Sequence, residues 1–102
     1  MRQKLENVEK ILAEHGESGF SQVIRQALNG SDQDLQEFLV SNELWGGPGS
    51  VADQAGVSLG RDVRRQIEMT LVELGLEQMR KSVVNDRTKT WVNAFRKWRE
   101  GI

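Results

Sequence analysis

The sequence predicts an all-α protein, a compact bundle of about five helices with a glycine-rich loop near the middle. Three observations lead to this prediction. Apolar residues recur every three or four positions over most of the chain, as they do on one face of a helix. No stretch alternates apolar and polar residues as a strand does. Finally, 102 residues suit one domain and are too few for two, so residues 1–102 are expected to form a single helical domain.

Three helices are expected before the loop. The first covers residues 2–15 and ends at Gly16, and the second ends at Gly30, because glycine is favoured just beyond a helix C-terminus. Ser31 and Asp34 have the spacing of a capping box at the start of the third. The apolar faces are formed by Leu5, Val8, Ile11 and Leu12, then by Phe20, Val23, Ile24, Ala27 and Leu28, then by Leu35, Phe38 and Leu39.

Two further helices and a short turn are expected after the loop. Ser50 and Asp53 repeat the capping pattern and predict a short helix or turn through about Ala55, which Gly56 ends. The longest helical signal begins at Arg61, and its wide apolar arc is typical of a central, buried helix. Gly75 interrupts this helix, and we expect another helix to pack closely there. The arc consists of two stripes, Val63, Ile67, Leu71 and Leu74, and Met69, Val72, Leu76 and Met79.

The last helix is expected over residues 88–100, after a polar turn at residues 85–88 that supplies its N-cap. Trp91, Phe95 and Trp98 fall on one stripe of this helix. An aromatic stripe at helical spacing is more often part of a core than a binding surface, so we interpret it as core-facing.

Composition narrows the function classes. The chain is 37% hydrophobic and 28% charged, which is typical of a globular protein and argues against disorder. It has no cysteine, which excludes disulfides, thiol chemistry and Cys-ligated zinc. No cofactor or metal site is predicted, and the charged N-terminus lacks the apolar stretch of a signal peptide. No run of residues has the length and apolarity of a membrane span, so we expect a cytoplasmic protein.

Charge is distributed unevenly along the chain. Residues 1–59 contain four Lys or Arg and nine Asp or Glu, whereas residues 60–102 contain ten and six. The basic half could bind an anionic partner. We expect instead that the two halves pack together with complementary charge.

The loop is the most specific feature of the sequence, because it holds the only proline and three of the ten glycines. A glycine-rich turn before a helix can bind an anion with backbone N–H groups, but Pro48 lacks that group. We favour a sharp turn that docks Trp45 in the core. A small hydrolytic or anion-binding enzyme would need Ser50, Asp53 and His15 to converge on one cleft. The candidate binding residues are Trp45, Gly46, Gly47, Gly49, Ser50 and Asp53.

A second candidate surface is the basic C-terminal part of the chain. Basic side chains beside aromatic rings can bind a phosphate backbone while the rings stack on bases. The same pattern also suits a helix that buries its aromatic stripe. The residues of this nucleic-acid alternative are Arg80, Lys81, Arg87, Lys89, Arg96, Lys97 and Arg99.

The loop also carries a resemblance. The segment is Trp45-Gly46-Gly47-Pro48-Gly49-Ser50-Val51-Ala52-Asp53. It resembles a family of small bacterial helical proteins, a domain of unknown function, that share an aromatic-Gly-Gly-x-Gly-Ser-x-x-Asp segment. The resemblance extends loosely from Ile11 to Asp53 and includes His15 and its neighbours. Pro48 stands at the variable position, where other members carry a different residue. It implies a helical fold and no particular reaction.

Together these features predict a protein-protein interaction module of the immunity or regulatory kind, and no enzyme. The expected partner is another protein or a second copy of the chain. Nucleic acid is a less favoured partner, and a membrane is not expected.

Overall fold

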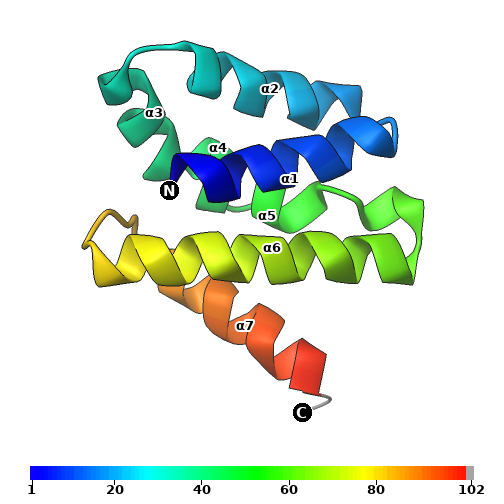
Figure 1. Cartoon of the computed structure of the whole chain (residues 1–102). Helices are drawn as coiled ribbons and strands as arrows, with labels where there is room; N and C mark the ends of the chain where they lie inside the picture. The colour runs from blue at the N-terminus through cyan, green and yellow to red at the C-terminus, as the bar shows by residue number, and fades with distance from the viewer. Residues whose placement is uncertain (101–102) are drawn as a thin grey trace.

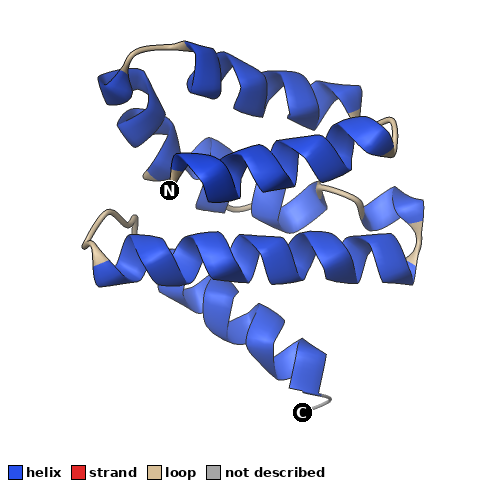
Figure 2. Ribbon diagram, viewed as in Figure 1, coloured by secondary structure: helices blue, strands red, loops and turns tan. Residues whose placement is uncertain are grey.

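The structure is a computed structural model that describes residues 1–100, of which α-helix is the dominant element. No strand occurs in these residues, and the chain measures 37 × 29 × 23 Å along its principal axes (Figure 2). The prediction of a compact all-α protein is therefore confirmed. The elements are α1 (Arg2–Glu14), α2 (Ser18–Asn29), α3 (Asp32–Leu39), α4 (Asn42–Trp45), α5 (Val51–Gln54), the 3₁₀ turn η1 (Val57–Leu59), α6 (Arg61–Arg80) and α7 (Thr88–Glu100).

The longer helices are stacked in layers. Figure 1 shows α2, α1, α6 and α7 following one another from top to bottom, with α4 and α5 behind α1 and α6. Helix α6 has 20 residues and packs against both α1 and α7, so the longest predicted helix is also the central one. None of the helices in residues 1–100 is long and apolar enough to cross a membrane.

The predicted helix ends are confirmed at several positions. Gly16 follows α1 with φ of +81°, a conformation that glycine adopts without strain. At the start of α3, the Ser31 hydroxyl accepts a hydrogen bond from the Asp34 N–H at 3.1 Å, and the Asp34 carboxylate accepts one from the Ser31 N–H at 3.0 Å. Before α7, the Asn85 side chain accepts from the Thr88 N–H at 3.0 Å. Local capping chemistry therefore determines where these helices begin and end.

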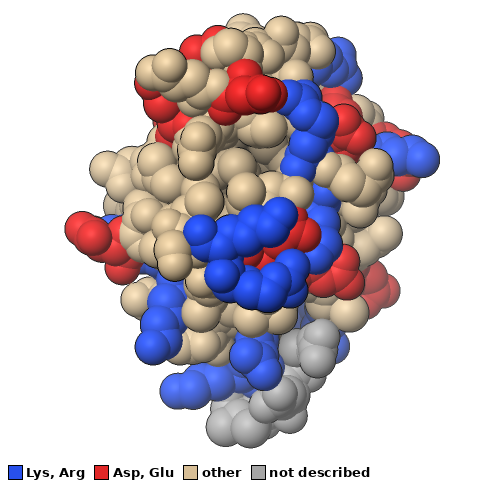
Figure 3. All heavy atoms as spheres, turned by 60° about the vertical axis from the view of Figure 1, so that its left-hand side comes forward, with Lys and Arg blue, Asp and Glu red and all other residues tan. Residues whose placement is uncertain are grey.

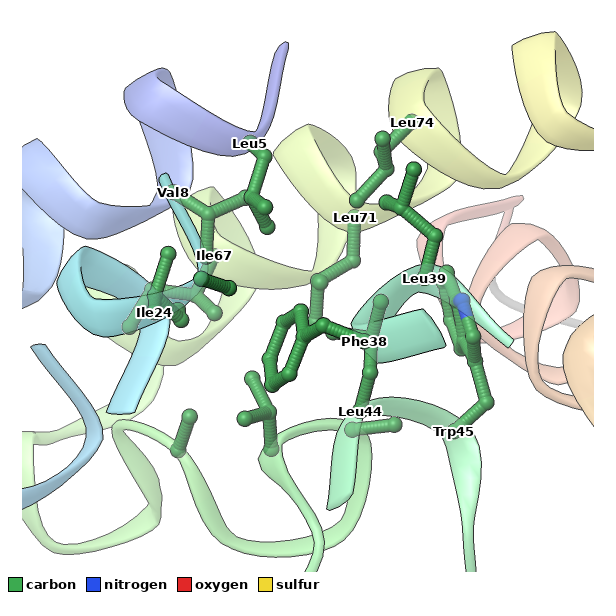
Figure 4. Packing of buried hydrophobic residues seen from close by; sticks show 14 of the residues in the cluster. Leu5, Val8, Ile24, Phe38, Leu39, Leu44, Trp45, Ile67, Leu71 and Leu74 are labelled. Carbon is green, nitrogen blue, oxygen red and sulfur yellow. The ribbon is translucent and has the colours of Figure 1, made fainter. Parts of the chain in front are cut away.

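The core lies between α6 and the N-terminal helices. Figure 4 shows apolar side chains converging on Ile67, Leu71 and Leu74 of α6, all three of which are fully buried. Trp45 and Phe95 are the largest buried side chains and bring α4 and α7 into the same cluster. Aromatic side chains bury a large apolar area, so these two rings make a large contribution to the core.

Gly75 lies where α6 contacts both α4 and α7. A Cβ atom at this position would overlap the Val92 side chain and lie 3.3 Å from the Trp45 ring. The predicted close packing at Gly75 is therefore confirmed. The absence of a side chain offsets the loss of helix propensity, which is about 1 kcal/mol relative to alanine.

Three expectations about the helices were wrong. A further single turn, α4, precedes the loop, because four residues are too short to give a periodic signal. Met69 and Leu76 on α6 are 41% and 39% exposed, because α6 has neighbours on two sides and behind but none over its outward face. Trp98 is 51% exposed, so the aromatic stripe of α7 is buried only in part.

The end of α6 stores a small amount of strain. Ser82 has φ of +60°, and the N–H groups of Ser82 and Val83 donate to the carbonyls of Met79 and Gln78. This is the Schellman arrangement, in which glycine is the preferred residue at the left-handed position. We expect Ser82→Gly to raise the free energy of unfolding by about 0.5–1 kcal/mol, measured by urea denaturation. A destabilised variant would contradict this account, and Ser58→Gly, outside any left-handed position, is the control.

Candidate functional site

The ring of Trp45 lies inside the core and not at the surface, where a partner could contact it. It is fully buried, and its Nε1–H donates to Oε1 of Gln78 at 2.9 Å. The Gln78 amide nitrogen in turn donates to the carbonyls of Leu39 and Val83, each at 2.8 Å. A partner therefore cannot contact this indole unless the core opens.

The loop that follows Trp45 is held by its own chain. The Gly46 carbonyl accepts from the Nε1–H of Trp91 at 3.0 Å and from the Ser50 hydroxyl at 3.1 Å. Gly49 has φ of +87°, a left-handed conformation that favours glycine. The loop thus ties the middle of the sequence to α7.

The turn into α5 carries an internal negative charge. The Asp53 carboxylate accepts from the Gly49 N–H at 3.1 Å, and the Asp53 N–H donates to the Ser50 hydroxyl at 3.1 Å. Hydrogen bonds from the Gln54 side chain and from the Gly49 backbone lower the pKa of Asp53. The backbone donor and the helix start that would attract an external anion therefore already stabilise this carboxylate.

The structure does not bring the three residues of the hydrolytic alternative together. His15 lies exposed at the end of α1, and no hydrogen bond in residues 1–100 joins it to Ser50 or Asp53. The Ser50 side chain is 3% exposed and its hydroxyl is engaged by Gly46 and Asp53. Among these three residues, therefore, no general base lies beside a free nucleophile.

Two surface pockets of about 250 Å³ lie elsewhere in the fold. One is between α3 and α4, and the other lies between the start of α1 and α3. In the described residues, no three acidic or histidine side chains are grouped closely enough to hold a metal ion. The lining residues are Asp34, Glu37, Phe38, Ser41 and Glu43 for the first, and Met1, Arg2, Asp32, Leu35, Gln36 and Leu39 for the second.

The basic residues of the nucleic-acid alternative lie along one end and one side of the molecule. Figure 3 shows Lys and Arg dominating the lower part of this face, toward the C-terminus. All those whose side chains are described are exposed, Arg80 included at 68%. They are Arg80 and Lys81 at the end of α6, Arg87 and Lys89 at the start of α7, and Arg96 and Lys97 near its end, while the side chain of Arg99 lies outside the described residues.

Trp98 lies on this basic helix and is the residue that the sequence misassigned. Its ring contacts Phe95 at a centroid distance of 5.7 Å but leaves half of its surface open. The Phe95 ring is buried by the guanidinium of Arg64, which lies 5.4 Å from its centroid, and by Trp91. Helical spacing identifies the stripe correctly, but it does not reveal that the neighbouring helices cover only its first two rings.

The ion pairs do not follow the expected packing of an acidic half against a basic half. The pairs between the halves join Lys4 and the Met1 amino group to Glu77, so the positive charges come from the acidic half. The Lys4 nitrogen lies 3.1 Å from the Glu77 carboxylate, and the guanidinium of Arg80, three residues further along α6, lies 3.8 Å from it. No ion pair joins the basic residues of α7 to an acidic side chain among residues 1–98, so their positive charge faces solvent.

Glu77 gives the fold a dependence on acid. The amino group of Met1, and then Lys4, lower the pKa of Glu77 from 4.5 to about 2. Because the folded-state pKa lies below the unfolded value, the carboxylate stabilises the fold above about pH 4.5, and this stabilisation is lost as the pH falls toward 2. We expect Glu77→Gln to be less stable than the parent at pH 7, and the difference to disappear near pH 2. Urea denaturation at several pH values measures it, with Glu43→Gln as the control, and a constant difference would contradict the assignment.

Two side chains with central roles were not singled out from the sequence. Gln78 continues the buried stripe of Ile67, Leu71 and Leu74, and a polar residue on such a stripe is a signal for a buried hydrogen-bonding role. Arg64 donates to the carbonyls of the α5 region at Ala52 and Ala55, both at 2.6 Å. Its sequence neighbours give no such signal, because basic residues at a helix start usually face solvent.

Comparison of the chain with protein-family models, with curated proteins and with solved structures found no match.

Proposed function

We propose that this chain is a small helical module that binds another protein through the basic face of α7. We use this name for the exposed surface of α7 as a whole, which carries the ring of Trp98 and the basic side chains of Arg87, Lys89, Arg96 and Lys97. Of these four, Arg87 and Lys97 project from the side of the helix nearest the ring. A role of the immunity or regulatory kind, in the cytoplasm, is part of this proposal. Membership of the bacterial family that residues 45–53 resemble is also part of this proposal.

The exposed ring of Trp98 is the observation that carries the proposal. It is the largest of the exposed hydrophobic side chains in the described residues, and half of its surface is open to solvent. Tryptophan dominates binding energy at protein interfaces because it buries a large apolar area and loses little side-chain entropy. A tryptophan whose only role is in the core stabilises the fold most when its ring is fully buried, as the ring of Trp45 is.

The charge around Trp98 indicates the chemistry of the partner. Arg96 and Lys97 precede the ring in sequence, and both are exposed. Basic side chains around an apolar centre match an acidic rim on the partner and accelerate association by long-range attraction. We therefore propose a partner with an acidic surface and an apolar pocket for the indole.

The test is capture of a partner by immobilised protein from a lysate of the source organism. We expect the parent chain to retain one protein in stoichiometric amount, and Trp98→Ala and the double variant Arg96→Glu/Lys97→Glu to lose at least tenfold in affinity. Gln33→Ala, an exposed change on α3, is the matched control and should bind like the parent. Equal retention by all variants, or retention of nothing by the parent, would reject this surface.

Nucleic-acid binding is the second candidate, and the same ring favours it. Single-stranded nucleic acid binds basic grooves with exposed aromatic side chains on which bases stack. Here the exposed aromatic residue and the basic residues occur on one helix. A gel shift at low salt with DNA and RNA is the test. Binding should weaken steeply with salt, and Lys97→Ala should reduce the salt slope by about 1. No shift at low salt would remove this candidate.

A further inference from the structure

We infer that two copies of this chain pair through the outward face of α6, in an antiparallel arrangement about a two-fold axis at Met69. We define this outward face as Arg65, Met69, Glu73 and Leu76, all of which are exposed. The inference concerns a surface other than the basic face of α7 and does not depend on the proposed function. In Figure 1, α6 lies across the front of the molecule with no other helix drawn over it.

The centre of this outward face is apolar. Met69 and Leu76 lie seven residues apart, which places them on the same side of the helix two turns from each other. They are 41% and 39% exposed, and they account for two of the six large hydrophobic side chains exposed in the described residues. Val72 lies beside them and is 7% exposed, so the apolar surface continues inward toward α7. In an antiparallel pair centred at Met69, the two Met69 side chains cover each other, and Leu76 lies at the edge of the contact.

The charges around Met69 have the symmetry that a two-fold pair requires. Arg65 lies four residues before Met69 and Glu73 lies four residues after it, so the three residues form one ridge of the helix. In an antiparallel pair centred at Met69, each Arg65 faces Glu73 of the other copy, and the axis doubles this contact. Neither Arg65 nor Glu73 takes part in an ion pair among residues 1–98. The complementary charges are therefore available for a second copy.

The charge pattern also selects the register. A two-fold axis between residues 72 and 73 would place Met69 opposite Leu76 of the other copy, which is favourable for the apolar side chains. The same axis would place Arg65 opposite Arg80, and like charges that face each other across an interface oppose association. The axis at Met69 avoids this repulsion and gives two attractive contacts. The small number of apolar residues at the centre makes the association weak, at the low end of specific interfaces.

The first test uses the absence of cysteine from the sequence. A residue on a two-fold axis lies next to its own copy, so Met69→Cys should form a disulfide-linked dimer under mild oxidation. Gln33→Cys, exposed on α3, controls for random collision, and Glu73→Cys reports the alternative register. We expect Met69→Cys to cross-link at least about tenfold faster than either variant. Equal rates for Met69→Cys and Gln33→Cys would overturn the pairing, and faster cross-linking at Glu73→Cys would overturn its register.

The second test reverses the charges and keeps the apolar centre. Sedimentation velocity up to about 1 mM protein should show a monomer–dimer equilibrium for the parent. Arg65→Glu and Glu73→Arg, each alone, should weaken dimerisation about tenfold, because two attractive contacts become two repulsive ones. The double variant restores opposite charges and should return to parent affinity, while Trp98→Ala should leave the equilibrium unchanged. A parent that stays monomeric, or a double variant as weak as the singles, would overturn the inference.

Discussion

Replacing Trp45 with alanine is expected to lower the free energy of unfolding by about 3–5 kcal/mol. The ring is fully buried and contacts Gly75, where the close approach of α6 leaves no side chain that could fill the space. The substitution also removes the N–H donor to Gln78, so a buried amide oxygen loses its partner. The loss of packing and the unpaired oxygen act in the same direction.

Urea denaturation followed by circular dichroism measures this change in stability. Trp98→Ala is the matched control, because its ring is half exposed and its removal should cost less than about 1 kcal/mol. Trp45→Phe separates the two causes, since phenylalanine retains most of the apolar ring but has no N–H group. A cost below about 1 kcal/mol for Trp45→Ala would mean that the indole is free to bind a partner.

Gln78→Leu is the second change with a large expected effect, a loss of about 2–5 kcal/mol in the free energy of unfolding. Leucine has a similar volume, so little packing is lost. The cost arises because three groups lose their partner at once: the buried indole N–H of Trp45, the buried carbonyl of Leu39 and the partly buried carbonyl of Val83. An unpaired buried polar group costs more than the hydrogen bond itself contributes to stability.

The matched control for Gln78→Leu is Gln66→Leu, an exposed position on the same helix. Thermal and urea denaturation of both variants should show a large loss for Gln78→Leu and a change within about 0.5 kcal/mol for Gln66→Leu. A double-mutant cycle with Trp45→Phe should give a coupling energy above about 0.5 kcal/mol, because both changes break the same hydrogen bond. Strict additivity would show that this bond contributes nothing.

Much of the fold follows from local chemistry that the sequence displays. The spacing of Leu5, Val8 and Leu12 identifies the buried side of α1, and all three are fully buried. Ser31 and Asp34 mark the start of α3 because each side chain satisfies the backbone of the other. Gly75 predicts a close helix contact because a glycine in a helix interior needs a packing reason. These signals depend on residues a few positions apart.

The parts that could not be predicted depend on how far one helix covers another. Trp98 and Phe95 lie on the same stripe of α7, yet one is half exposed and the other 1% exposed. Met69 and Val72 differ in the same way on one stripe of α6, since Met69 is 41% exposed on the outward face and Val72 is 7% exposed. The sequence spacing is identical whether or not a second helix reaches the position. Lys4 and Glu77 are 73 residues apart, so their pairing could not be read from a helical pattern.

For the candidate site, the sequence identified the unusual loop, the burial of Trp45 and the capping of the next helix by Ser50. The predicted burial of the Trp45 ring follows from the turn chemistry of residues 46–49. The carbonyl of Gly46 accepts hydrogen bonds from the side chains of Trp91 and Ser50. This role could not be predicted, because a backbone acceptor has no signature in the sequence.

The amide of Gln78 has a consequence for the order in which the chain acquires its structure. It joins carbonyls at residues 39 and 83 to the indole at residue 45, so its bonds are complete only when three separate segments have assembled around α6. A partly unfolded form in which any one of these segments has detached no longer has the full set of hydrogen bonds to Gln78. Amide protons of α4 and of the central turns of α6 should therefore exchange with deuterium through the same global opening. The free energy of opening that is measured from their exchange should be the same for both segments.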